Sequence, residues 1–97
     1  MLIVTEQRLI DYAKQHSQAT GSLLRWGALV KSGKWRSLAD TRLTFANADP
    51  VGQCTVFNIK GNDYRLITRI GYGLQTVTLK YFLTHAEYDR GSWKKDC

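Results

Sequence analysis

The regular alternation of apolar and polar side chains in the second half of this chain most constrains its fold. Apolar and polar residues alternate at period two over about 55–59, 64–70 and 75–83, which predicts three β-strands. Gly61-Asn62 and Gly71-Tyr72-Gly73 separate these segments, and both are typical of tight turns. The pattern therefore predicts two consecutive antiparallel hairpins that share the middle strand.

The first half of the chain predicts helices. After a short strand at residues 2–4, Thr5 and Ser22 are expected to cap two helices with apolar stripes, and Ser37 a third, shorter one. The segment 47–52, with one proline and one glycine, predicts a break before the hairpins. The order βααβββ favours an α+β fold, with two N-terminal helices packed on one face of a small antiparallel β-sheet.

Length and charge narrow the class of protein. Ninety-seven residues, 43% of them apolar, predict a single folded domain over 1–97. The net charge of +6 favours a polyanionic partner, nucleic acid first and an anionic membrane surface second. Lys and Arg outnumber Asp and Glu by seven to four in both 1–59 and 60–97, so folding has to create any basic patch. No segment approaches the roughly 20 apolar residues of a membrane span, and we expect no membrane partner.

The two cysteines do not indicate a disulfide framework or a metal site. Cys54 opens an apolar run and is expected to be a buried thiol, whereas Cys97 is expected to be an exposed one. A reducing cytoplasm is the simplest location, although the two cysteines can in principle pair. We expect no cofactor, because the sequence contains neither a phosphate-binding loop nor His, Cys and Asp at metal-ligand spacing.

Alternation also assigns side chains to the two faces of the sheet. The residues expected in the core are Tyr64, Leu66, Thr68, Ile70, Val77, Leu79, Tyr81 and Leu83. The opposite face is expected to carry Arg65, Arg69, Lys80 and Phe82, joined by Asn58 and Lys60 from the first strand. Cations around an aromatic ring suit a single-stranded nucleic acid, since phosphates pair with cations while a base stacks on the ring. The alternative is an ordinary solvated sheet face.

A histidine and a tyrosine follow the last strand. His85 comes directly after it, three residues before Tyr88. Imidazole exchanges protons near neutral pH, so His85 is a candidate general acid or base. A structural hydrogen bond by His85, and a capped turn at Tyr88 and Asp89, are the alternatives.

Two motifs carry a resemblance to a known family. They are Val56-Phe57-Asn58-Ile59-x-Gly61-Asn62-x-Tyr64-Arg65-Leu66-Ile67 and Thr84-His85-x-Glu87-Tyr88-Asp89, followed by Trp93-Lys94. Together with the N-terminal helices, Trp35-Arg36-Ser37 and the stretch 45–49, they resemble the HigB toxin family over almost the whole chain.

The resemblance implies a bacterial type II toxin of the RelE superfamily, whose members are small α+β mRNA interferases that generally cut messages on the ribosome. It also implies a helix-turn-helix antitoxin of the HigA kind as partner. Asn58, Arg65, His85 and Tyr88 fall on motif positions, and Lys80 lies where the family tends to have a basic residue. Arg69 and Lys60 rest on the face assignment alone.

A mechanism follows in outline. We expect Arg65 and Lys80 to bind the phosphate, His85 to act as base or acid, Tyr88 to orient it or donate a proton, and Asn58 to position the RNA. A non-catalytic RNA- or ribosome-binding module that uses the same basic face is the main alternative. A small structural domain, whose charge serves only solubility, is the other.

Overall fold

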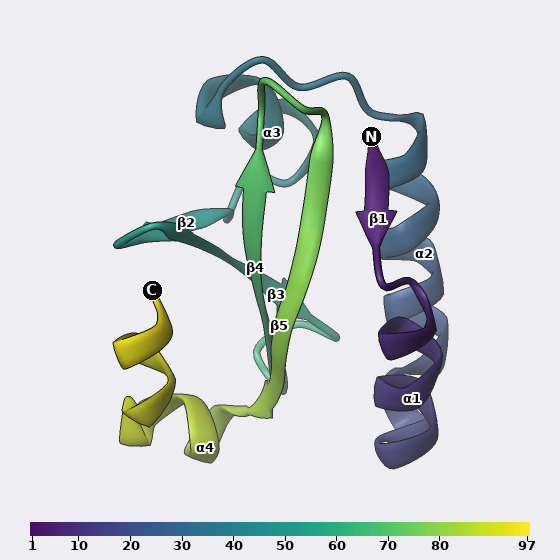
Figure 1. The fold of residues 1–97 in the computed structure, drawn as a ribbon. Coiled ribbons are helices and arrows are strands. Elements are labelled where there is room, and N and C mark those ends of the chain that lie inside the picture. Colours follow the sequence, from purple (N-terminus) through teal and green to yellow (C-terminus); the bar gives the residue numbers. More distant parts are fainter.

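The computed structural model describes residues 1–97 and contains one five-stranded sheet with helices against it (Figure 1). In spatial order the strands are β1 (Leu2–Val4), β5 (Thr76–Thr84), β4 (Tyr64–Gly71), β3 (Cys54–Ile59) and β2 (Asp49–Val51). The helices are α1 (Gln7–Gln15), α2 (Thr20–Ser32), α3 (Leu38–Thr44) and α4 (His85–Arg90), with 3₁₀ turns at Ser17–Ala19 and Ser92–Asp96. The α+β prediction is confirmed. The sheet is mixed, however, because β1 pairs parallel with β5 while the other pairs are antiparallel.

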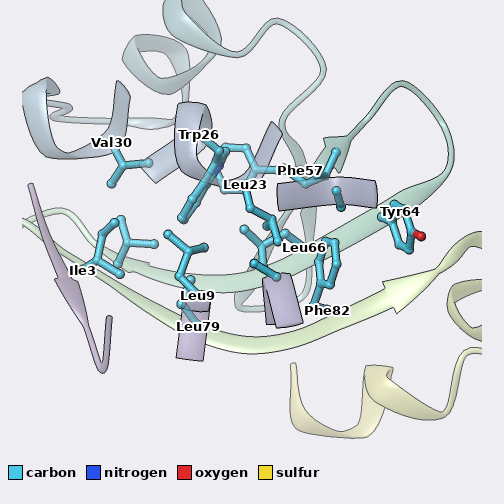
Figure 2. Close-up of a cluster of buried hydrophobic side chains, with 14 of the residues drawn as sticks. Ile3, Leu9, Leu23, Trp26, Val30, Phe57, Tyr64, Leu66, Leu79 and Phe82 are labelled. Atoms are coloured by element: carbon cyan, nitrogen blue, oxygen red, sulfur yellow. The ribbon is translucent and has the colours of Figure 1, made fainter. Parts of the chain in front are cut away.

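The helices α1 and α2 lie on one side of the sheet, and the C-terminal segment with α4 lies on the other (Figure 1). We call the first side the helix face and the second the C-terminal face. On the helix face, side chains from β1, α1, α2 and the three long strands form one cluster of sixteen buried residues (Figure 2). Trp26 and Phe57 lie at its centre with their rings edge to face, 5.4 Å between centroids. No helix is long and apolar enough to cross a membrane.

The predicted helix caps are borne out at one of three positions. Ser37 caps α3, because its side chain accepts a hydrogen bond from the Asp40 amide. Thr5 instead has a positive φ of 59° and lies outside α1, whose N-cap position is Glu6. Ser22 lies inside α2, because the 3₁₀ turn at Ser17–Ala19 leads directly into a helix that begins at Thr20.

The face assignment of the last strand is wrong beyond Lys80. The register of β4 and β5 shifts there, because Thr68 pairs with Leu79 and Ile67 with Tyr81, which leaves Lys80 as an extra residue. Such a bulge reverses the facing of every residue that follows it. Phe82 consequently lies in the core on the helix face, 6% exposed.

The C-terminal face is also partly covered, by a segment that the alternation did not predict. Cys54, Val56, Ile67 and Trp93 form a small buried cluster there, and Tyr81 and Leu83, two residues that we expected in the main core, pack against it. Cys54 and Cys97 are joined in a disulfide, which corrects the expectation of two thiols. The disulfide and this cluster hold the C-terminal segment on the sheet.

Candidate functional site

A pocket of about 430 Å³ opens on the C-terminal face, and we call it the site pocket. Its lining residues are Arg42, Ala46, Asn47, Ala48, Asp49, Val56, Asn58, Arg65 and Tyr88. They come from α3, the α3–β2 loop, β2, β3, β4 and α4, so the pocket exists only when these elements are assembled.

Strand register places three of these residues on one face. Asp49 of β2 lies opposite Val56 of β3, and Asn58 of β3 lies opposite Arg65 of β4. Val56 and Asn58 are two residues apart and therefore point to the same side of the sheet. Asp49, Asn58 and Arg65 thus form a polar row beside the apolar side chain of Val56.

Arg65 is held in a defined orientation by backbone carbonyls. Its Nη1 donates to the carbonyl oxygen of Asn62 at 3.0 Å and to that of Tyr64 at 3.1 Å. Its guanidinium carbon lies 5.4 Å from the ring centroid of Tyr88, within the range of a cation–π contact. A guanidinium ordered in this way is suited to bind a phosphate, because little of its freedom remains to be lost.

Tyr88 projects from α4, which a capping box fixes at its start. The Thr84 hydroxyl accepts from the Glu87 amide, and the Glu87 carboxylate accepts from the Thr84 amide. This contact with the Thr84 backbone lowers the pKa of Glu87. Burial raises the pKa of Tyr88, and nearby Asp49 and Asp89 raise it further while Arg65 opposes them. The phenol is therefore neutral near pH 7 and able to donate a hydrogen bond or a proton.

The charged groups of the site pocket have no ion-pair partners. The three ion pairs of the chain are Lys31–Glu6, Lys60–Asp63 and His85–Asp89, and none of them includes Arg42, Asp49 or Arg65. Arg42 donates from Nε to the carbonyl of Ala48 at 3.0 Å, which ties α3 to the loop that walls the pocket. The pocket therefore presents two guanidinium groups, one carboxylate, two amides and a neutral phenol. No group of three or more His, Cys, Asp or Glu side chains is placed to hold a metal ion.

Comparison with known proteins decides the family. The family described as HigB_toxin, RelE-like toxic component of a toxin-antitoxin system, matches residues 19–91, about three quarters of the chain. The chain belongs to the HigB toxin family. The resemblance drawn from the two sequence motifs is thereby confirmed.

Named relatives of this HigB-family chain are similar over nearly their whole length. The mRNA interferase toxin HigB of Escherichia coli strain K12 is 25% identical over 92 residues, which cover 92% of this chain and 88% of that protein. The proteins named mRNA interferase HigB from Escherichia coli O157:H7 and Shigella flexneri match with the same identity and coverage. All three are known by an activity on mRNA.

The structure brings together three of the eight residues that the sequence predicted for the site of this HigB-family chain. Asn58, Arg65 and Tyr88 line the site pocket. His85 does not, although it lies one helical turn before Tyr88 on α4. It is exposed, and its Nδ1 lies 3.0 Å from the Asp89 carboxylate.

The other four predicted residues also lie outside the pocket lining. Lys60 pairs with Asp63 at 3.8 Å and lines a smaller neighbouring pocket of about 170 Å³ that also includes Asn58. Arg69 is exposed and lies opposite Thr78, and Lys80 lies at the bulge of β5. Phe82 is buried on the helix face with its ring stacked on Tyr64, so it offers no platform for a base.

Arg42, Asn47 and Asp49 line the pocket but were not among the predicted site residues. The sequence does contain a signal for Asp49. Gly52-Gln53 is a two-residue hairpin turn between the paired residues Val51 and Cys54, and a hairpin there makes the segment that contains Asp49 a strand beside β3. Gly52 has a φ of 57°, as such turns require, so 47–52 is in part a strand rather than only a break. Arg42 carries no comparable signal, because it lies on a helix that reaches the pocket only through tertiary packing.

Proposed function

We propose that this chain is an mRNA endoribonuclease, the toxin of a type II toxin–antitoxin system, which cuts translated mRNA on the ribosome. The observation that carries the proposal is the convergence of two unpaired guanidinium groups with a neutral phenol in one open pocket. Phosphoryl transfer needs cations for the phosphate and a proton for the leaving oxygen. The names of the three relatives, all mRNA interferases, support the same activity.

The proposed reaction uses the ribose 2′-hydroxyl as nucleophile and requires no metal. The 2′-oxygen attacks the adjacent phosphorus and loses its proton to a base, while the bond to the 5′-oxygen breaks. Arg65 and Arg42 stabilise the charge on the phosphorane, and Tyr88 donates a proton to the departing 5′-oxygen. The products are a 2′,3′-cyclic phosphate and a 5′-hydroxyl.

The remaining predicted residues take roles around this centre. Asn58 positions the RNA, because it pairs with Arg65 across the two strands and lines the same pocket. His85 serves as the base, provided that RNA binding draws α4 and the substrate together. Lys60, Arg69 and Lys80 attract the RNA backbone outside the pocket.

The proposed partners follow from the family. The substrate is mRNA bound to the ribosome, and the protein partner is a HigA-like helix-turn-helix antitoxin that neutralises the toxin. The proposed location is the bacterial cytoplasm, and the proposed unit of function is the single domain 1–97.

One observation favours a second candidate function. No histidine lines the site pocket, and His85 is engaged with Asp89 instead. A non-catalytic RNA- or ribosome-binding module, with Arg42 and Arg65 as its phosphate contacts, needs no base and therefore fits this arrangement.

The two functions separate in a translation extract supplied with one defined mRNA. Primer extension maps new 5′ ends for the wild-type protein, Arg65→Ala, Tyr88→Phe and His85→Ala. The control is Lys14→Ala, which removes an exposed cation of α1 on the other side of the sheet. The expected result is cuts on translated RNA, their loss in Arg65→Ala, Tyr88→Phe and His85→Ala, and their retention in Lys14→Ala. Tight ribosome binding without any cut would favour the binding module, and cuts on untranslated RNA would refute the dependence on the ribosome.

A further inference from the structure

The support for Tyr88 comes from outside its own helix. The six-residue helix α4 has no buried residue. Trp93, in contrast, is only 2% exposed and stacks on Tyr88, with 4.8 Å between ring centroids and 17° between planes. Its indole Nε1 also donates to the Tyr88 carbonyl at 2.9 Å. Side chain and backbone of Tyr88 are therefore both held by the same tryptophan.

Trp93 is itself fastened to the sheet by the residues that follow it. The Cys54–Cys97 disulfide joins the C-terminal turn to β3, across 43 positions of sequence. The Gln53 amide donates to the Cys97 carbonyl at 2.6 Å, and the Tyr81 hydroxyl donates to the Asp96 carboxylate. A Cβ atom at Gly52 would lie 2.5 Å from the Cys97 carbonyl oxygen, so the two segments touch at the backbone. We call Trp93 together with the Cys54–Cys97 bond the C-terminal clamp.

We propose that the C-terminal clamp positions Tyr88 over Arg65, and that the oxidation state of Cys54 and Cys97 sets how well it does so. This inference rests on the proposed function, in which Tyr88 acts on the RNA. Trp93 is a positioning residue, since it acts through Tyr88 and does not line the site pocket.

The redox step is a thiol–disulfide exchange. With both cysteines as thiols, a small-molecule disulfide accepts two electrons, the Cys54–Cys97 bond forms, and two small thiols leave with the protons. A dithiol reverses the reaction and becomes a disulfide itself. Because a bacterial cytoplasm keeps most thiols reduced, the clamp would be open under ordinary conditions and would close under oxidation.

The expected effect is on turnover more than on RNA binding. A displacement of a catalytic group by about 1 Å can lower a rate about 100-fold. Opening the clamp frees Tyr88, while Arg42, Asn58 and Arg65 keep their places because other elements hold them. We therefore expect kcat for RNA cleavage to fall about 10- to 100-fold, with little change in KM.

The kinetic test compares Trp93→Ala, Trp93→Phe and Cys97→Ser with the wild-type protein in a translation system prepared without thiol reductant. The wild-type protein is assayed before and after treatment with dithiothreitol. Three results would support the clamp. Trp93→Ala should have a low kcat that Trp93→Phe partly restores, and dithiothreitol should lower the kcat of the wild-type protein. Cys97→Ser should have the same low kcat as the reduced wild type, and dithiothreitol should not lower it further. Equal kcat values for wild type and Trp93→Ala, with Tyr88→Phe impaired, would overturn it.

A second readout does not depend on cleavage. The titration of Tyr88 can be followed by NMR of ring-labelled tyrosine in the same variants. Burial holds the pKa of Tyr88 above its ordinary value, with Asp49 of β2, Asp89 of α4 and Arg65 of β4 as the charges near it. Trp93→Ala is expected to move that pKa down towards 10. If the pKa of Tyr88 were the same in Trp93→Ala and wild type, the clamp would be overturned, whether or not the protein cuts RNA. If the pKa fell but no RNA were cut, only the proposed function would be refuted.

Discussion

The two faces of the sheet differ in both size and chemistry. The helix face buries sixteen residues in one cluster, with tryptophan, phenylalanine and tyrosine rings packed against each other. The C-terminal face buries only four, and beside them lie the unpaired cations and the phenol of the site pocket. Stability and chemistry are therefore divided between the two faces. Substitutions on the helix face should change folding, and substitutions on the C-terminal face should change activity.

The largest expected effect is the loss of Phe57 from the helix face. Phe57 is 1% exposed and packs edge to face against Trp26 and Phe45. Phe57→Ala should lower the free energy of unfolding by about 3–5 kcal/mol, because the cavity costs packing in addition to transfer energy. Urea denaturation measures this change.

The neighbouring residue Asn58 provides the matched control on the opposite face. Asn58 is exposed, so Asn58→Ala should change the free energy of unfolding by less than about 0.5 kcal/mol. The same substitution should weaken RNA binding. If both substitutions destabilised the fold equally, the division between the faces would be refuted.

Two arginines of β4, Arg65 and Arg69, differ in their position relative to the site pocket. Arg65→Ala should slow RNA cleavage about 100- to 1,000-fold, because it removes one preorganised donor from the phosphate. Arg69 lies on the same strand outside the pocket, so Arg69→Ala should weaken RNA binding but leave the single-turnover rate at saturating RNA nearly unchanged. Single-turnover cleavage of one RNA, at two salt concentrations, measures both effects. Equal losses in the two variants would show that general charge, rather than the pocket, carries the activity.

The smallest effect concerns the start of α4. Thr84→Ala removes one half of the capping box and should lower the free energy of unfolding by about 1 kcal/mol. The folded state holds the pKa of Glu87 below its ordinary value, so the Glu87 contribution is fully present above the pKa of an unfolded glutamate. It is lost as pH falls through the folded pKa.

The measurement is stability against pH, in wild type and Thr84→Ala, over the range about pH 3–6 that brackets glutamate titration. Wild type should lose stability towards acid more steeply than the variant, because the Thr84 contacts lower the pKa of Glu87. If the free energy of unfolding changed with pH equally in the two proteins, the Thr84 contacts would not lower the pKa of Glu87 in the folded state.

Local rules predict the three long strands and the N-terminal helices but not β2 or α4. The three long strands and their turns followed from alternation and glycine placement, and the Ser37 cap from its side-chain chemistry. The six residues of α4 carry too little periodicity for the sequence to distinguish a short helix from a capped turn. The strand β2 was hidden in a segment that contains the single proline, Pro50.

The fold class, the family and the motif positions Asn58, Arg65 and Tyr88 follow from the sequence, because they depend on local patterns and on residue identity. Tertiary structure alone decided the bulge at Lys80, which turned Phe82 into the core, since a single inserted residue reverses facing without a sequence mark. It also decided that Arg42 and Asp49 join the pocket and that Cys54 meets Cys97. These contacts link residues far apart along the chain, and only packing sets their distance.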